Sequence, residues 1–187
     1  MAKLIYVTNV SLDGFIEDEG GGINWFPTGD EVFAFHTELL RSVGMFLYGR
    51  RLYEAMAVWE TDAALAARSD LTADFASAWQ AAGKVVYSTT LAAVSTAGTR
   101  LERRFDPAAV RELKATSGRD LMVGGANLAA QAFQAGLVDE CLLVVLPVVL
   151  GGGKPGLPTG VRADLELLDE RRFRNGVVQL RYRLLGQ

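Results

Sequence analysis

The sequence of 187 residues has little of two residue types that build many active sites, and each scarcity excludes a class of site. Cys141 is the single cysteine and His36 the single histidine, so neither a disulfide within the chain nor a zinc site of the usual Cys/His composition can form. We therefore expect no metal. Cys141 lies in an apolar run, which predicts a small buried residue rather than a nucleophile. A catalytic triad at His36 is disfavoured, because no serine and aspartate partners are identifiable.

An excess of charge and a long hydrophobic run are also lacking. The formal net charge is -3, and the basic residues are scattered except around 100–104 and 171–172, so no face is built to bind nucleic acid. No apolar run approaches the roughly 20 residues of a membrane-spanning helix, and the start shows no signal-peptide pattern. We expect a soluble, cytoplasmic protein whose partner is a small-molecule substrate, not nucleic acid or a membrane.

What is present is enough apolar sequence for one sizeable core. Hydrophobic residues make up 50% of the chain, so we predict a single domain over residues 1–187. Buried strands are predicted at 4–10, 45–48, 84–88, 121–124 and 137–146, and helices at 30–43, 71–82, 107–115 and 126–135. Two further strands, 164–173 and 177–185, meet at Asn175-Gly176, a strong hairpin signal. This order predicts an α/β fold with a mostly parallel sheet and an antiparallel C-terminal hairpin.

Several predicted strands end in residues that suit a phosphate group. Gly124 and Gly125 lead from a strand into a helix, which lets backbone N–H groups approach an anion, although a tight turn needs no more than this. Gly49 likewise leads from a strand into a helix. Arg50 and Arg51, which follow it, are either phosphate ligands or solvated surface residues. Hydroxyl side chains at 88–90 follow a third strand. They are either ligands of a phosphate or ribose group or ordinary turn residues. The G-x-G-x-x-G and P-loop motifs are absent, so a nucleotide must be held differently.

The segments between the predicted strands and helices are assigned as follows. Residues 58–70 read as an Ala-rich connection, and the Gly/Pro-rich tract 151–160 as an irregular loop at the sheet's edge. Trp25 and Phe26 are predicted either to stack on a flat ligand or to pin their loop to the core. Asp13 is either a proton donor beside the end of the first strand or part of an Asp-Gly turn.

Six stretches, taken together and in order, resemble a known superfamily: 11–16, 48–53, 85–88, 123–127, 137–140 and 147–154. They are similar to the dihydrofolate reductase-like superfamily, in particular to the C-terminal reductase domain of the bifunctional riboflavin-biosynthesis (RibD-type) deaminase/reductase and its stand-alone relatives. The likeness covers nearly the whole chain. It implies a three-layer dihydrofolate reductase-like fold, NADPH as hydride donor, and a homodimer.

The resemblance also implies roles for individual residues. Thr8, Asn9, Phe15 and Ile16 would meet the nicotinamide; Gly49, Arg50, Arg51 and Leu52 the pyrophosphate; Ser88, Thr89 and Thr90 the adenosine ribose and its 2′-phosphate; and Val123, Gly124, Gly125, Ala126, Asn127 and Leu128 would complete the phosphate cradle. The substrate would lie among the first helix, the loop after the first strand and the segment from Pro147, with Trp25, Phe33 and Pro147 as its contacts.

Two departures from the family pattern affect the expected chemistry. A basic residue commonly follows the serine in relatives that prefer NADPH, whereas Thr89 is neutral, so NADH is not excluded and selectivity would depend on Arg50 or Arg51. The acid of true dihydrofolate reductases would fall near Phe33. Asp30 lies close to this position. It is either the catalytic acid or a charge in the first turn of a helix, stabilised by the macrodipole. Dihydrofolate is therefore disfavoured as substrate.

We expect an NADPH-dependent reductase acting on an unidentified small substrate, with the proton coming from water or Asp13. Riboflavin-pathway reduction of 5-amino-6-(5-phosphoribosylamino)uracil is one alternative, disfavoured because no deaminase sequence with zinc-binding residues precedes residue 1. A non-catalytic, dimeric nucleotide-binding protein is another.

Overall fold

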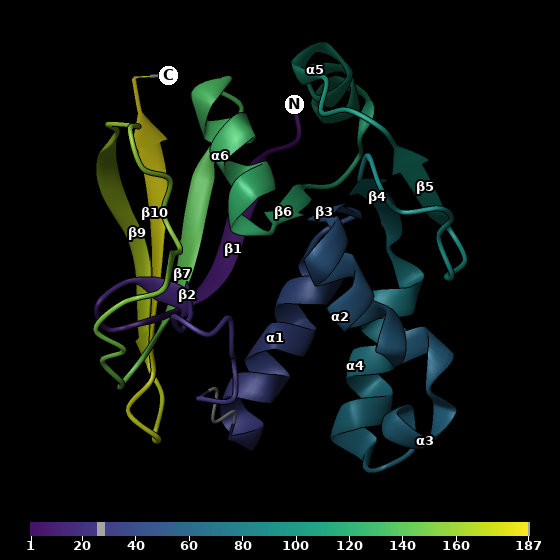
Figure 1. Cartoon of the computed structure of the whole chain (residues 1–187), viewed down its shortest axis with the longest axis vertical. Helices are drawn as coiled ribbons and strands as arrows, with labels where there is room; N and C mark the ends of the chain where they lie inside the picture. Colours follow the sequence, from purple (N-terminus) through teal and green to yellow (C-terminus); the bar gives the residue numbers. More distant parts are fainter. Residues whose placement is uncertain (26–28, 187) are drawn as a thin grey trace.

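Strands and helices alternate along most of the described chain, which comprises residues 1–25 and 29–186 of the computed structural model (Figure 1). The strands are β1 (Leu4–Ser11), β2 (Phe15–Glu17), β3 (Met45–Gly49), β4 (Gly83–Tyr87), β5 (Thr99–Glu102), β6 (Leu121–Gly124), β7 (Glu140–Leu146), β8 (Lys154–Pro155), β9 (Asp164–Arg172) and β10 (Val178–Leu185). The helices are α1 (Asp30–Ser42), α2 (Arg50–Thr61), α3 (Ala63–Ala66), α4 (Asp70–Ala81), α5 (Pro107–Thr116) and α6 (Ala126–Gln134). The expectation for Phe26 lies outside the described residues.

The larger sheet has the strand order β5-β4-β3-β6-β1-β7-β10-β9, and a smaller sheet pairs β2 with β8. From β5 to β7 every neighbouring pair in the larger sheet is parallel. In contrast, β10 runs antiparallel to both β7 and β9. The predicted α/β class, with a mostly parallel sheet and an antiparallel C-terminal hairpin, is therefore confirmed.

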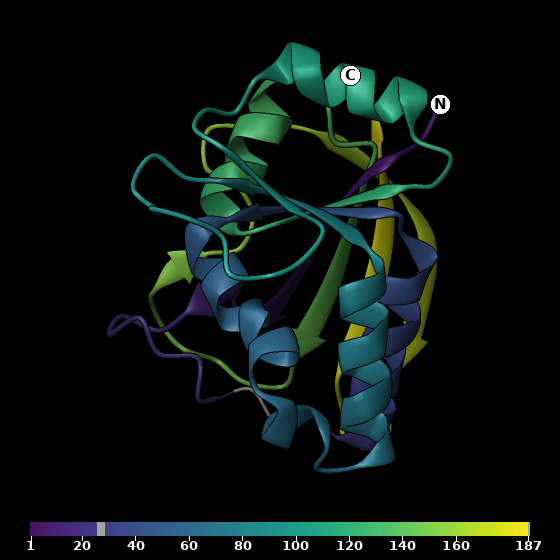
Figure 2. The same cartoon turned by 90° about the vertical axis from the view of Figure 1, so that its right-hand side faces the viewer.

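Alternate residues of the central strands face two different helix layers. Leu4 and Tyr6 of β1 pack in the cluster that contains Phe133 of α6, whereas Ile5 packs in the cluster that contains Val32 of α1. This alternation follows from the period of two in a strand, and both faces are apolar because both are covered. Figures 1 and 2 show the result, with α5 and α6 over one face of the sheet and α1, α2 and α4 over the other.

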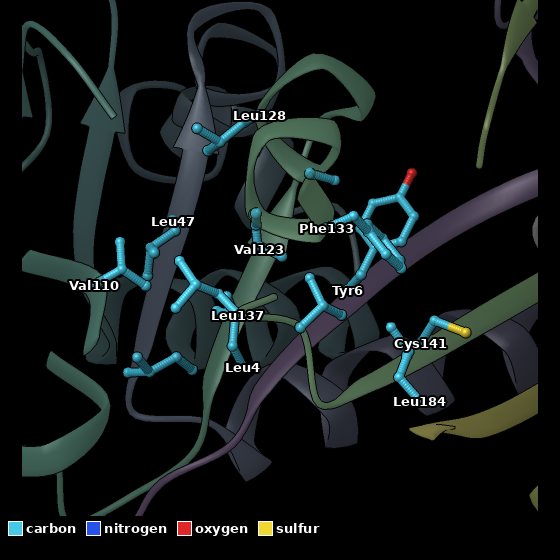
Figure 3. Packing of buried hydrophobic residues seen from close by; sticks show 14 residues of the cluster. Leu4, Tyr6, Leu47, Val110, Val123, Leu128, Phe133, Leu137, Cys141 and Leu184 are labelled. Carbon is cyan, nitrogen blue, oxygen red and sulfur yellow. The ribbon is translucent and has the colours of Figure 1, made fainter. Parts of the chain in front are cut away.

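The core beneath α6 is a group of buried apolar side chains around β1 and β6 (Figure 3). The rings of Tyr6 and Phe133 meet edge to face there, with their centroids 5.6 Å apart. Cys141 is 1% exposed in the same cluster, and burial raises the pKa of its thiol to about 11. The prediction that Cys141 is a small buried residue is confirmed.

The connection predicted at 58–70 is wrong in part, because α2 continues to Thr61 and α3 follows it. Tertiary packing extends the helix. The Trp59 ring lies 4.6 Å from the Phe75 ring of α4 and 5.9 Å from the Phe33 ring of α1, centroid to centroid. Burial of this indole against two other helices favours another turn of α2, which local sequence does not reveal.

The tract 151–160 is irregular for most of its length, as predicted, but it contains the short strand β8 and packs against β1. Its β8 pairs with β2, and the Tyr6 hydroxyl donates a 2.5 Å hydrogen bond to the Gly156 carbonyl oxygen. Gly153 has a φ of 133°, and a Cβ there would lie 1.9 Å from the Glu17 carbonyl oxygen. Only glycine permits that approach.

None of the helices among residues 1–25 and 29–186 combines the length and the apolar character needed to cross a membrane.

Candidate functional site

The parallel strands β3, β4, β5 and β6 end at the same edge of the sheet, where a cavity of about 520 Å³ opens. Ligands of open α/β sheets bind at this edge, beyond the carboxyl ends of the strands. The cavity is lined by Gly49, Arg50, Arg51, Leu52, Tyr87, Ser88, Thr89, Thr90, Arg103, Arg104, Phe105, Gly125, Ala126, Asn127, Leu128, Gln131 and Lys154. Most of the residues assigned to the cofactor by resemblance are thus brought together in one place.

Two helices begin at the wall of this cavity with glycine at the N-cap. Neither Gly49 before α2 nor Gly125 before α6 provides a side-chain cap, whereas Ser69 caps α4 and Asp106 caps α5. Gly125 has a φ of 94°, which favours glycine, and a Cβ there would lie only 3.7 Å from the Gly49 backbone nitrogen. The first-turn N–H groups of both helices therefore have no side-chain cap and lie beside one another, as an anion-binding site requires.

Among the described residues that line the cavity, none is a carboxylate and five are cations: Arg50, Arg51, Arg103, Arg104 and Lys154. Four of them have partners. Arg50 pairs with Glu54 at 2.8 Å, Arg51 and Lys154 lie 3.6 and 3.8 Å from Glu17, and Arg103 donates to the Leu91 carbonyl oxygen at 2.6 Å. Exposed Arg104 makes no hydrogen bond or ion pair within the described part of the chain. This excess of positive charge suits a ligand with several phosphates.

The loop 88–90 is held in place by its own side chains and by α2. The Ser88 hydroxyl accepts hydrogen bonds from the backbone nitrogens of Thr90 at 3.2 Å and Leu91 at 2.9 Å. Arg50 Nη1 donates to the Thr90 hydroxyl at 2.9 Å. The Ser88 hydroxyl oxygen thus already bonds the backbone, and the loop is fixed against the N-terminus of α2 before any ligand binds.

A second cavity of about 250 Å³ adjoins the first, under α1. It is lined by Val7, Thr8, Asn9, Phe33, His36, Leu39, Leu40, Tyr48, Leu52, Met56, Phe75, Met122 and Gly124. Leu52 lines both cavities, and Gly124 of this one is the neighbour of Gly125 in the other. We refer to them as the cationic cavity and the apolar cavity. Thr8, Asn9, Phe33 and Gly124, all predicted site residues, belong to the apolar cavity.

The two candidate proton donors lie outside both cavities. The Asp13 carboxylate accepts hydrogen bonds from the backbone nitrogens of Leu150 at 3.1 Å and Gly151 at 2.7 Å. A hydrogen bond with Ser11 and these backbone N–H groups lower the pKa of Asp13 to about 2. Asp13 is therefore ionised near neutral pH and ties a loop together. Asp30 is exposed in the first turn of α1.

Other predicted site residues also line neither cavity. Phe15 and Ile16 lie in β2, and Val123 is fully buried in the core beneath α6. Trp25 donates from Nε1 to the Gly22 carbonyl oxygen at 3.1 Å and packs against the core, the arrangement expected if it pins its loop. Pro147 is exposed just after β7.

Sequence reasoning missed several residues of the cationic cavity: Tyr87, Arg103, Arg104, Phe105, Gln131 and Lys154. A signal existed for Arg103 and Arg104, because they directly follow a strand whose carboxyl end lies at the same edge. No local signal marks Lys154, which the pairing of β8 with β2 places there. His36, rejected as a triad member, lines the apolar cavity.

Comparison with known proteins agrees with this architecture. The family model of the RibD C-terminal domain matches residues 2–179. The chain belongs to the RibD C-terminal domain family. This RibD C-terminal domain protein is 31% identical over 186 residues to the uncharacterized protein YyaP of Bacillus subtilis (strain 168), a match that covers 98% of the chain and 96% of YyaP. The resemblance inferred from the six stretches is confirmed.

Solved structures with the same fold include a putative riboflavin biosynthesis protein from Shewanella sp. PV-4, with a TM-score of 0.76, 20% identity and 100% of each chain covered. Another is the diaminohydroxyphosphoribosylaminopyrimidine deaminase/5-amino-6-(5-phosphoribosylamino)uracil reductase of Thermotoga maritima, with a TM-score of 0.64 and 13% identity. That match covers 98% of the RibD C-terminal domain protein but 56% of the Thermotoga chain. At these identities the likeness establishes the fold.

Proposed function

We propose that the protein is a reductase that binds NADPH in the cationic cavity and transfers hydride to a small molecule in the apolar cavity. The observation that carries this proposal is the lining of the cationic cavity, whose described residues include five cations, no carboxylate and two helix N-termini without side-chain caps. Membership of the RibD C-terminal domain family supports the reductase class.

The residues present fit a phosphorylated dinucleotide. The backbone at Gly49 and Gly125, with Arg50 and Arg51, would hold the pyrophosphate, because uncapped N–H groups and guanidinium groups both favour phosphate oxygens. Thr89 and Arg104 would face the adenosine ribose and its 2′-phosphate. We assign the preference for NADPH over NADH to Arg104, the lining cation that makes neither a hydrogen bond nor an ion pair with the described residues.

Bound NADPH supplies the hydride, and the chain's residues supply position and environment. Apolar walls such as Phe33, Leu39 and Met56 exclude water around the acceptor. Since Asp13 is ionised and lies outside the cavity, we assign the proton to solvent rather than to this carboxyl group.

The test is a titration of NADPH and of NADH, followed by tryptophan fluorescence, for the wild type and Arg104→Ala. Loss of one charge-assisted hydrogen bond should weaken NADPH binding about 10- to 100-fold, and NADH binding should change less than about twofold. Arg100→Ala is the matched control, because Arg100 lies on β5, pairs with Glu102 at 2.9 Å and lines neither cavity. Equal weakening of both cofactors would contradict the role of Arg104, and no saturable binding of either would contradict the cofactor site.

Turnover is tested separately from binding. Loss of NADPH absorbance is measured with a panel of carbonyl, imine and dihydropterin compounds and with the phosphoribosylaminouracil. Oxidation with any member supports a reductase. Binding without oxidation across the panel would favour the non-catalytic alternative.

A further inference from the structure

Arg103 uses its guanidinium group differently from the other paired cations of the cationic cavity. Those cations face a glutamate, whereas Arg103 bonds to backbone carbonyl oxygens. Its Nη1 donates to the oxygens of Ser88 at 3.2 Å and Leu91 at 2.6 Å, and its Nη2 donates to the oxygen of Ala92 at 3.5 Å. Arg103 directly follows β5, so a residue at the end of one strand holds the segment that leaves the neighbouring strand, β4.

The amide side of this segment is fixed as well. We refer to residues 88–91 as the bend. The Ser88 hydroxyl accepts hydrogen bonds from the backbone nitrogens of Thr90 and Leu91. Thr89 lies between these bonds, is exposed, and makes no hydrogen bond among residues 1–25 and 29–186. Its N–H and hydroxyl groups are therefore left for a ligand in the cationic cavity, which Thr89 lines.

The bonds of Arg103 require a guanidinium group. This group offers five N–H donors in one rigid plane and can bond several carbonyl oxygens at once, whereas the ammonium group of lysine is a compact charge on a flexible chain. Without these bonds the carbonyl oxygens of Ser88 and Leu91 turn to water, and the bend opens more easily. A cofactor that contacts the bend must then supply the free energy of ordering it.

The far end of the connection between β4 and β5 is held by α2, independently of Arg103. The Tyr53 hydroxyl oxygen, on a residue that is 2% exposed, accepts a 2.7 Å hydrogen bond from the Ser95 backbone nitrogen. Glu60 Oε1 accepts one of 2.7 Å from the Ala97 backbone nitrogen. A substitution at Arg103 should therefore loosen the bend without releasing the whole connection.

Resting on the proposed reductase function, we propose that Arg103 is a positioning residue for the cofactor. It fixes the bend so that Thr89 meets the adenosine ribose. It binds no phosphate itself, because both of its terminal nitrogens already donate to carbonyl oxygens. Two neighbouring arginines then have different roles: Arg104 distinguishes NADPH from NADH, and Arg103 sets the affinity for both.

The first experiment compares three ligands by calorimetry in the wild type and in Arg103→Lys, which keeps the positive charge. NADPH and NADH both contain the adenosine group, whereas inorganic pyrophosphate contains only the part that the helix N-termini would hold. We expect Arg103→Lys to bind NADPH and NADH each about tenfold more weakly, and to bind pyrophosphate within about twofold of the wild type. A loss confined to NADPH, an equal loss for pyrophosphate, or no loss for the two dinucleotides would overturn the proposal.

Arg100→Lys is the matched control. It makes the same substitution on β5, at a residue that lines neither cavity. Its affinities for the three ligands should lie within about twofold of those of the wild type. A loss as large as that of Arg103→Lys would show that the exchange itself, and not the bonds to the bend, weakens binding, and would overturn the assignment.

Hydrogen–deuterium exchange of the ligand-free protein tests the positioning step directly. In Arg103→Lys the Thr90 and Leu91 amides, which bond the Ser88 hydroxyl, should exchange about tenfold faster, whereas the Ala97 amide should keep its rate. Unchanged exchange in the bend, or faster exchange throughout the connection, would contradict the role of Arg103. Pyrophosphate binding reports that the variant is folded.

The two proposals fail in different ways. If the wild type binds neither NADPH nor NADH, the proposed function is overturned, and the role of Arg103 falls with it. If the wild type binds both and Arg103→Lys binds them equally well, only the inference about Arg103 is overturned.

Discussion

Gly124 lies where a single added methyl group would disturb both cavities. A Cβ at this position would come within 2.4 Å of Leu52 Cδ2 and 3.3 Å of two ring carbons of Tyr48. Carbon atoms in ordinary contact lie about 3.5 to 4.0 Å apart, so the Leu52 methyl must move by about 1 Å or more in Gly124→Ala. Because Leu52 lines both cavities, its displacement alters the junction between them.

Overpacking of this kind costs about 1 to 3 kcal/mol of unfolding free energy. In a protein of this size that corresponds to a fall in Tm of about 2 to 4 °C for each kcal/mol. We expect Gly124→Ala to lower the urea midpoint without changing the slope of the transition, and to weaken NADPH binding in the fluorescence titration. Gly118→Ala is the matched control, since a Cβ there meets no atom within 4 Å. It should leave both quantities unchanged or raise stability slightly.

The same substitution in a Leu52→Ala background tests the cause. If the clash with Leu52 is responsible, Gly124→Ala should cost much less once the Leu52 side chain is shortened, so the two changes will not add. An equal cost in both backgrounds would refute the steric explanation.

Three further predictions concern Glu140, Asp13 and Cys141. Glu140, 1% exposed and bound by Lys3 at 2.5 Å and Arg181 at 2.6 Å, has its pKa lowered because these bonds outweigh the effect of burial. Glu140→Gln should lower the free energy of unfolding, measured in urea, by about 3 kcal/mol at pH 7. This loss relative to the wild type should shrink as the pH falls below 4.5, the ordinary pKa of the carboxyl group. A loss that stays constant with pH would contradict the coupling of stability to the ionisation of Glu140. Asp13→Asn should leave the pH profile of hydride transfer between about pH 6 and 8 unchanged, because a carboxyl with a pKa of about 2 does not titrate there; loss of a limb of the profile would restore Asp13 as proton donor. Cys141 should react with Ellman's reagent only as fast as the protein unfolds, whereas rapid reaction of the native protein would show that the thiol is accessible.

Much of the fold could be predicted from the sequence, because the strands of a doubly covered sheet are short apolar runs and the helices have clear ends. The Asp106-Pro107 start and the Asn175-Gly176 turn lie where local chemistry places them. The length of α2 could not be predicted, since its last turn depends on the contact of Trp59 with rings from two other helices.

The cationic cavity was partly predictable, for a physical reason. Gly49 and Gly125 each follow a parallel strand, and such strand ends meet at one edge of a sheet. Lys154 could not be found this way, because its position depends on a pairing between two short strands more than a hundred residues apart. His36 has an ordinary apolar helical neighbourhood in sequence, and its place beside the apolar cavity depends on how α1 packs on the sheet.

The central place of β1 has a consequence for how the chain is made. Its two neighbours come from late in the sequence, with Leu4 opposite Leu121 of β6 and Tyr6 opposite Cys141 of β7. During synthesis β1 therefore lacks its native partner strands until most of the chain has left the ribosome. Strand pairing over such long sequence separations is also slow. A strand that is apolar on both faces is prone to the wrong association in that interval. Residues 121–146 thus provide both neighbours of β1 as well as part of the wall of each cavity.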